Sequence, residues 1–210
     1  MGRTGYRGLL LQPEDHGQVI AGCIKANTMT SATVKKHSGI PIVHLISGLP
    51  CSGKTTYATA LRADVNGVLF SLDRWLITSF GKYPIASVGH EEHTRRVLAC
   101  RALIWESAVE LLRRSADVIL DDGFFLRVNR VRHIGLAQAA GARAKIHFID
   151  TPIGVVRSRL ERRNANLPPH NFHIDPETLQ GFLGLFERPS PDEGGEVVIV
   201  RDVLQSRARE

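Results

Sequence analysis

The sequence predicts an α/β fold, in which helices cover both faces of a mainly parallel five-stranded sheet in a three-layer α/β/α sandwich. Short apolar runs of strand length alternate along the chain with longer segments of helical periodicity, an order that is typical of parallel sheets. A glycine-rich segment directly follows the first apolar run and predicts a loop at the carboxyl end of the first strand. The five predicted strands are residues 42–47, 67–72, 117–120, 144–149 and 196–200.

A single folded domain accounts for most of the chain. With 210 residues, the protein is large for one domain and small for two. Residues 1–39 show no clear helical or strand period, which predicts a poorly ordered N-terminal extension, and Met29 offers an alternative start of translation. We therefore expect one domain over residues 40–210.

Composition and charge exclude several classes of protein. Hydrophobic residues make up 43% and charged residues 23%, as in ordinary globular proteins, and no apolar run of the sequence is long enough to span a bilayer. The formal net charge of +6 suits a nucleotide or a larger polyanion. Nucleic acid is not the favoured partner, because aromatic residues make up only 6% and no RNA-binding signature occurs in the sequence.

The cysteines favour a reducing compartment. Cys23, Cys51 and Cys100 are odd in number and lack the spacing of metal ligands, which argues against a disulfide framework. The cytoplasm is therefore the expected location.

A phosphate-binding loop follows the first predicted strand. Residues 48–55 match the pattern G-x-x-x-x-G-K-[ST], and a helical pattern follows them, so that strand, loop and helix occur in the required order. Glycines allow successive backbone N–H groups to point at phosphates, and the helix adds the positive end of its dipole. The residues expected to contact the nucleotide here are Gly48, Pro50, Cys51, Ser52, Gly53, Lys54, Thr55 and Thr56.

Four side chains in and directly after this loop have specific interpretations. Lys54 is expected to reach the β- and γ-phosphates, and the Thr55 hydroxyl to ligate the Mg²⁺ that bridges them. Thr56 is the weaker candidate for the metal. Cys51 is either a passive small side chain, which is the favoured interpretation, or a thiol whose modification blocks nucleotide binding.

Asp73 follows the second predicted strand. Ligands of open parallel sheets bind beyond the carboxyl ends of the strands, so Asp73 is expected to face the same crevice as the phosphate-binding loop. There it is our candidate for the base that orients an acceptor hydroxyl and accepts its proton. For this residue alone, the N-cap of a helix beginning at Arg74 is an equally good interpretation.

Two helical segments flank the third predicted strand. The stronger pattern covers residues 91–114, where apolar residues recur at steps of three and four and predict a core-facing stripe. The second covers residues 128–140 and ends before Gly141, a common C-terminal stop.

The third predicted strand runs into two carboxylates, Asp121 and Asp122. A carboxylate in this position supports Mg²⁺ directly or through water. Asp121 is favoured because it directly follows the apolar run, and the alternation of a strand points one of the two side chains away.

Arginines concentrate before a loop-like segment over about residues 164–176. Arg159 and Arg163 share a helix face, and we expect this segment to be a mobile lid that brings them over the transferred phosphoryl group. Their charge would then offset charge that develops in the transition state. A solvated basic helix face is the alternative. Arg130 is a further candidate for a phosphate contact, with a merely exposed position as the favoured interpretation.

These motifs together resemble the zeta-toxin-like and chloramphenicol-phosphotransferase-like P-loop kinases, which are often catalogued as AAA-type ATP-binding proteins. The resemblance covers about residues 40–200. It rests on residues 48–56, 71–73, 118–125 with Arg130, 159–164 and 186–189.

This resemblance implies a sandwich of the P-loop NTPase type, with ATP as phosphoryl donor and Mg²⁺ as metal. It assigns the base to Asp73, lid positions to Arg159, Arg163 and Asn164, and a place beside the adenine to Phe186. Asp122 is an extra carboxylate relative to the family pattern and leaves the metal assignment open between it and Asp121.

The predicted function is an ATP-dependent phosphotransferase that moves the γ-phosphoryl group to a hydroxyl of a small molecule. Asp73, Lys54, Arg159 and Arg163 are the candidate catalytic residues. One alternative is a polynucleotide 5′-hydroxyl kinase, which shares this machinery and suits the positive charge. The other is a nucleotide-binding ATPase or switch that acts through a protein partner. Acceptor specificity is expected from residues 77–94.

Overall fold

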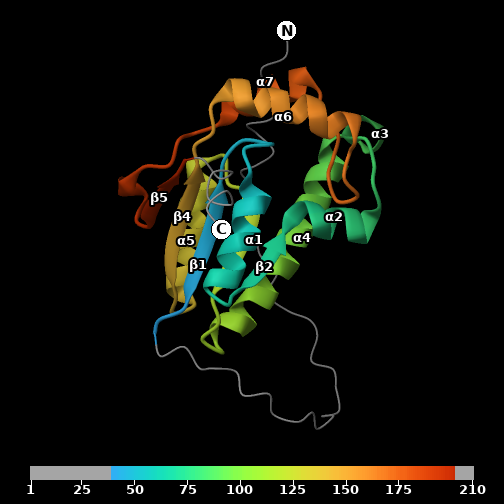
Figure 1. The fold of residues 1–210 in the computed structure, drawn as a ribbon. Helices are drawn as coiled ribbons and strands as arrows, with labels where there is room; N and C mark the ends of the chain where they lie inside the picture. Colours follow the sequence, from blue (N-terminus) through green and yellow to red (C-terminus); the bar gives the residue numbers. More distant parts are fainter. Residues whose placement is uncertain (1–38, 202–210) are drawn as a thin grey trace.

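A parallel five-stranded sheet forms the centre of the molecule (Figure 1). The computed structural model describes residues 39–201, so the predicted N-terminal extension up to residue 38, with Met29, lies outside the described residues. The strand order is β2-β3-β1-β4-β5, and helices on both faces confirm the predicted α/β/α fold of the P-loop NTPase type. The strands are β1 (Ile42–Ser47), β2 (Val68–Ser71), β3 (Val118–Gly123), β4 (Arg143–Ile149) and β5 (Glu196–Val200).

The strand β3 is longer than the sequence predicts. The predicted segment 117–120 corresponds to a strand that continues to Gly123, and it pairs with β1 up to Ser47. Asp121 and Asp122 are therefore successive strand residues rather than loop residues. Because side chains alternate along a strand, the two carboxylates point to opposite faces of the sheet.

Helices cover the two faces unequally. Alternate residues of β1 belong to different clusters: Val43 and Leu45 pack on the side of α2, α4 and α5, whereas Ile46 packs on the side of α1. The predicted helices 91–114 and 128–140 correspond to α4 and α5. The helix bounds are α1 (Lys54–Asp64), α2 (Leu72–Phe80), α3 (Ile85–Val88), α4 (His90–Leu112) and α5 (Arg127–Ala139).

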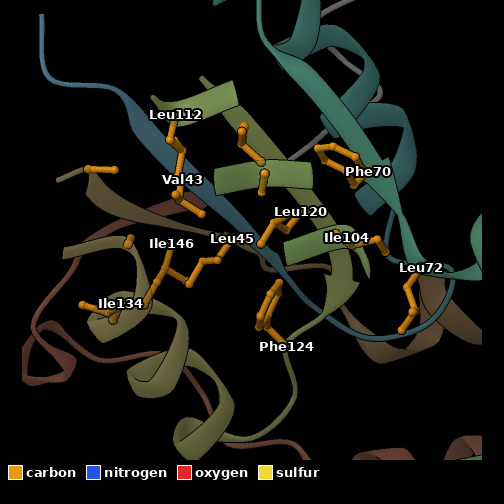
Figure 2. Close-up of a cluster of buried hydrophobic side chains, with 14 of the residues drawn as sticks. Val43, Leu45, Phe70, Leu72, Ile104, Leu112, Leu120, Phe124, Ile134 and Ile146 are labelled. Atoms are coloured by element: carbon orange, nitrogen blue, oxygen red, sulfur yellow. The ribbon is translucent and has the colours of Figure 1, made fainter. Parts of the chain in front are cut away.

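The larger core lies between the sheet and α2, α4 and α5 (Figure 2). Leu45 and Ile146 contribute from neighbouring strands, Ile104 from α4 and Ile134 from α5, and each of these side chains is buried. Burial of such a side chain contributes about 1.5–3 kcal/mol to folding. The core therefore fixes α2 and α4 against the strands whose carboxyl ends carry the candidate site.

Two further helices lie together at one end of the molecule, at the top of Figure 1. These are α6 (Ile153–Ala165) and α7 (Pro176–Leu185). Leu160 and Leu179 from the two helices form a third cluster, against which Leu49 and Cys51 of the loop after β1 pack. The predicted lid segment 164–176 is thus divided, because only residues 166–175 connect the helices. No described helix is both long and apolar enough to cross a membrane.

Polar side chains under α1 are paired with one another. The Tyr57 hydroxyl lies 2.8 Å from His147 Nδ1, and His147 Nε2 lies 2.9 Å from His44 Nδ1. Burial lowers the pKa of both histidines, that of His147 to about 3. This chain of contacts ties α1 to β1 and β4 and so supports the helix that begins at the glycine-rich loop.

Candidate active site

Glycines shape the loop after β1 at positions where a side chain would not fit. Gly48 has a φ of +152°, and a Cβ there would lie 2.9 Å from Ser52 Oγ and 3.0 Å from the Ile149 carbonyl oxygen. Gly53 is the N-cap of α1 and has a φ of 104°, in the left-handed region that favours glycine. The loop therefore folds tightly and leads directly into the positive end of the α1 dipole.

Ser52 lies at the centre of this loop and is buried. Its carbonyl oxygen accepts hydrogen bonds from Thr151 Oγ1 at 2.8 Å and from Arg159 at 3.1 Å. Its hydroxyl oxygen is buried and has no hydrogen-bond partner among the described residues. A buried polar atom without a partner is costly, so a ligand oxygen in the loop would satisfy a group that the protein leaves unsatisfied.

Lys54 and Thr55 follow the loop and contact different neighbours. Lys54 Nζ donates to the Leu49 carbonyl at 2.8 Å and so folds back over the loop. Thr55 Oγ1 donates to Asp121 Oδ2 at 2.7 Å. Thr56, the other predicted metal candidate on this helix, is exposed like Thr55, and the hydrogen bond to Asp121 is made by Thr55. The geometry thus brings together Thr55 and Asp121, two oxygen donors of the kind that Mg²⁺ prefers.

The two carboxylates of β3 have different partners. Asp121 is 7% exposed and faces Thr55, whereas Asp122 accepts hydrogen bonds from Arg101 Nε and Nη2 at 2.6 and 2.7 Å. Arg101 has no assigned role in the sequence analysis. Its pairing has no local signal, because it joins residues 21 positions apart. The bidentate pair neutralises Asp122 on the opposite face and leaves Asp121 as the carboxylate beside the phosphate-binding loop.

Asp73 lies in the first turn of α2, directly after β2. The helix begins at Leu72 with Ser71 as its N-cap, so the interpretation of Asp73 as an N-cap is wrong. Solvent reaches this residue, but the surrounding protein partly desolvates its carboxylate. That desolvation, together with the negative charge of Asp121, raises the pKa of Asp73 to about 6.

The charges around Asp73 form one electrostatic group. Burial lowers the pKa of Lys54, and the charges of Asp121 and Asp73 oppose this shift. Burial raises the pKa of Asp121, and Lys54 and Thr55 oppose that shift. Arg163 also acts on Lys54 and Asp73 through its charge. Residues from β3, α1, α2 and α6 therefore meet in one charged site.

The predicted lid arginines contact backbone carbonyl groups. Arg159 donates to Ser52 in the phosphate-binding loop, and Arg163 Nη2 donates to the Phe172 carbonyl at 3.1 Å. The neighbouring Asn164 donates to the Ile174 carbonyl at 2.7 Å. The last turn of α6 is thus hydrogen-bonded to two residues of the loop 166–175, Phe172 and Ile174.

Phe186 ends α7 and stacks on Phe148 of β4, with ring centroids 5.6 Å apart and an interplanar angle of 28°. The Arg188 guanidinium lies over the same Phe148 ring, 4.6 Å from its centroid. Arg188 also donates to Asp150, which follows β4. An aromatic surface therefore lies next to the end of β4, and the predicted adenine contact of Phe186 stays a prediction.

Arg130 is buried, so its expected exposure is wrong. Its guanidinium is fully buried and donates to Glu193 at 2.7 and 2.6 Å and to the Phe124 carbonyl at 2.9 Å. Glu193 lies 63 positions away in the short helix Pro191–Glu193, and no local pattern links the two. Arg130 is thus a structural residue that fixes the loop after β3.

Two aromatic residues of the predicted specificity segment also have internal partners. The Arg96 guanidinium lies 4.9 Å from the Phe80 ring centroid and 4.7 Å from that of Tyr83. The Tyr83 ring also makes an edge contact with Phe172 of the loop 166–175. These side chains connect α2 and α4 with the loop after α6.

The loop and its neighbours fit a Mg²⁺–nucleotide complex. The glycine cradle, the unsatisfied Ser52 hydroxyl and the Thr55–Asp121 oxygen pair supply the geometry and the donor atoms. Thr55 and Asp121 would hold the metal, which would neutralise phosphate charge when bound. Gly48 and Gly53 provide the positive φ values that the tight turn of the loop requires.

Comparison with known proteins identifies the family. Residues 43–189 match the profile of a family described as AAA domain. A search of curated protein sequences gave no significant match.

Solved structures share the fold. A protein described as "a putative kinase" from Chloroflexus aurantiacus aligns with a TM-score of 0.65 and 20% identity, over 80% of this chain and 92% of that one. Kti12 of Chaetomium thermophilum, in complex with ADP-AlF3, aligns with a TM-score of 0.57 and 17% identity, over 76% and 88%. A chain of the Pnkp1/Rnl/Hen1 RNA repair complex aligns with a TM-score of 0.55 and 20% identity, over 74% of this chain and 46% of that one.

Proposed function

We propose that this chain, which belongs to the AAA domain family, is an ATP-dependent phosphotransferase acting on a hydroxyl of a small molecule. The observation that carries the proposal is the position of Asp73. Its carboxylate shares an electrostatic site with Lys54 and Asp121 and has a pKa of about 6. A nucleotide-binding site alone needs no such base.

Asp73 supplies the proton acceptor in this proposal. The acceptor oxygen attacks the γ-phosphorus of ATP, a new O–P bond forms, and the bond from the γ-phosphorus to the bridging oxygen breaks to release ADP. The proton of the acceptor hydroxyl passes to Asp73. A pKa near 6 suits this task, because the group is ionised at neutral pH and remains basic enough to take the proton.

The remaining residues act on the donor. Thr55 and Asp121 would hold Mg²⁺, and Lys54 would contact the β- and γ-phosphates. Arg159 and Arg163 neutralise charge on the transferred group, which is the largest contribution that a protein makes to phosphoryl transfer. The cytoplasm is the proposed location, consistent with the unpaired thiols of Cys51 and Cys100.

A polynucleotide 5′-hydroxyl kinase is the second candidate. It is favoured by the net charge of +6 and by the fold shared with a chain of the Pnkp1/Rnl/Hen1 RNA repair complex. The small molecule remains the leading acceptor, because the sequence carries no aromatic nucleic-acid signature. A switch that acts through a protein partner is the third candidate, and it requires no base at Asp73.

The decisive test combines an acceptor screen with an isosteric variant. γ-Labelled ATP is offered with nucleosides, 5′-hydroxyl oligonucleotides, aminoglycosides, chloramphenicol-like alcohols and sugars, and labelled product is counted. Asp73→Asn is expected to lower transfer by roughly 10²–10⁴-fold while ATP binding stays unchanged. Asp64→Asn, at the far and exposed end of α1, is the matched control and is expected to retain transfer.

The outcomes separate the three candidates. Labelling of small alcohols or sugars supports the leading proposal, and labelling confined to oligonucleotides supports the second. If no acceptor is labelled and Asp73→Asn turns over ATP like the wild type, the phosphotransferase proposal fails and the switch remains.

A further inference from the structure

The loop between α6 and α7 is attached to α4 by one aromatic side chain. The Phe172 ring makes edge contacts with Tyr83 and His93, with ring centroids 5.4 and 6.3 Å apart. Tyr83 and His93 also contact each other, with the Tyr83 hydroxyl 3.2 Å from His93 Nδ1. Phe172 therefore occupies an aromatic niche formed by Tyr83 and His93.

Contacts outside the loop support this niche. Tyr83 lies against the Arg96 guanidinium, which donates in turn to Glu92 at 2.7 Å one helical turn earlier. Phe172 also packs against the larger hydrophobic core. Edge contacts between aromatic rings stabilise such an arrangement beyond the burial of their surface. Phe172 is thus a firm attachment point between the loop and α4.

The backbone of the same residue holds Arg163. Arg163 Nη2 donates to the Phe172 carbonyl, while Arg163 Nε is buried and has no partner among the described residues. The charge of Arg163 reaches Lys54 and Asp73. One edge of the guanidinium is therefore occupied by the loop, and its buried Nε donor is left unsatisfied among the described residues.

We propose that Phe172 is a positioning residue: its ring, docked between Tyr83 and His93, fixes the carbonyl that orients Arg163 for the γ-phosphoryl group of ATP. The inference rests on the proposed function of Arg163 as a phosphate-contacting residue. The inference adds that Tyr83 and His93, which do not belong to the phosphate-binding loop, affect the affinity for Mg-ATP. Arg163 loses this orientation when the ring is removed, although no atom of the Phe172 side chain touches the nucleotide.

The test compares the dissociation constants of Mg-ATP and Mg-ADP by titration calorimetry, because only ATP carries the γ-phosphoryl group. Arg163→Ala is expected to weaken Mg-ATP roughly tenfold or more, as for a lost charge-assisted hydrogen bond, and to leave Mg-ADP within about twofold. Phe172→Ala is expected to reproduce this selective loss. The double variant is expected to lose no more affinity for Mg-ATP than Arg163→Ala alone, because both changes remove the same contact between Arg163 and the γ-phosphoryl group.

Matched variants separate positioning from general damage to the loop region. Phe182→Ala removes a ring of α7 that packs on Phe125 rather than on Tyr83 or His93, and is expected to keep the preference for ATP. Phe172→Tyr keeps the ring and is expected to keep the preference as well. If Phe172→Ala does not fold, Tyr83→Leu opens the niche from the opposite side and carries the same expectation.

Two results would overturn the inference in different ways. If Arg163→Ala loses the preference for ATP but Phe172→Ala and Tyr83→Leu retain it, Phe172 has no positioning role and the proposed function stands. If Arg163→Ala itself retains the preference, Arg163 does not contact the γ-phosphoryl group, and its proposed role fails together with the inference.

Discussion

At the scale of single residues, two neighbouring carboxylates are prepared for different tasks. Asp121 is buried and held by Thr55 and the charge of Lys54, so it is suited to hold a cation. Asp73 remains open to solvent and has the pKa of about 6 that a proton acceptor needs at neutral pH. Environment rather than residue type therefore separates the proposed metal ligand from the proposed base.

The pKa of Asp73 predicts the acid limb of the pH profile. A base must be ionised to accept a proton, so the rate of transfer is expected to be level above pH 7 and to fall below pH 6. The decline approaches about tenfold per pH unit once the carboxylate is mostly protonated. The measurement is kcat/KM between pH 5 and 8 with the acceptor found in the screen. A rate that stays constant down to pH 5 contradicts the role of Asp73.

At the scale of elements, a buried ion pair joins α5 to the short helix at Pro191–Glu193. Arg130 and Glu193 are both fully buried, and Arg130 also donates to the Phe124 carbonyl in the loop after β3. Gly123, the last residue of β3, and Phe124, in the loop itself, both have a positive φ. The pair therefore holds the chain where it turns away from the end of β3, next to the Gly48 N–H that donates to Gly123.

Removal of one partner of this pair is expected to destabilise the protein strongly. Glu193→Gln leaves the Arg130 charge buried without its counter-charge, at a cost of about 3–5 kcal/mol in the free energy of unfolding. Urea denaturation followed by circular dichroism measures the change. Glu196→Gln, whose carboxylate pairs with Lys145 at the surface, is the control and is expected to cost under about 1 kcal/mol. A similar small loss for Glu193→Gln contradicts the interpretation.

At the scale of the whole molecule, the phosphate-binding loop joins two parts of the structure. Leu49 and Cys51 pack into the cluster formed by α6 and α7, and Arg159 donates to Ser52 in the same loop. The loop also begins at the end of β1, in the centre of the sheet. The loop is thus packed between elements that are far apart in the sequence, so a ligand bound there would favour the native state of both parts.

Binding of Mg-ATP is expected to raise the melting temperature. At one hundred times its dissociation constant, a ligand of the native state adds about 2.7 kcal/mol, which corresponds to roughly 5–10 °C for a chain of this size. Differential scanning calorimetry measures the shift. Lys54→Ala is expected to lose most of this shift at the same ligand concentration. Lys145 lies on β4 and pairs with Glu196 of β5, and Lys145→Ala is expected to retain the shift. An equal shift in all three proteins argues against binding at this loop.

Predictions from the sequence succeed where the signal is local. The loop around Gly48 and Lys54, the five strands and the helix α4 each follow from residues adjacent in the chain, because backbone conformation and apolar periodicity depend on near neighbours. The position of Asp121 near the carboxyl end of β3 follows from the same kind of local pattern, and its role toward a metal stays a prediction. The N-cap interpretation of Asp73 is wrong because the helix begins two residues earlier, and helix boundaries are weakly encoded.

Predictions fail or stop where distant residues meet. The pairs Arg130–Glu193 and Arg101–Asp122 have no periodicity that links their members, so neither the burial of Arg130 nor the pairing of Asp122 is readable from the sequence. The same holds for Phe172, whose niche is built from residues about 80 to 90 positions earlier in the chain.

The sequence by itself determines that the chain forms a parallel α/β sandwich with a phosphate-binding loop at Gly48–Thr55, because these features are written in local patterns. Only the tertiary structure decides that Asp121 rather than Asp122 meets Thr55, and that Arg163 is held by the loop that Phe172 attaches to α4. The physical reason is that electrostatic pairing and packing depend on distance in space, which the fold sets by bringing the carboxyl ends of parallel strands to one edge.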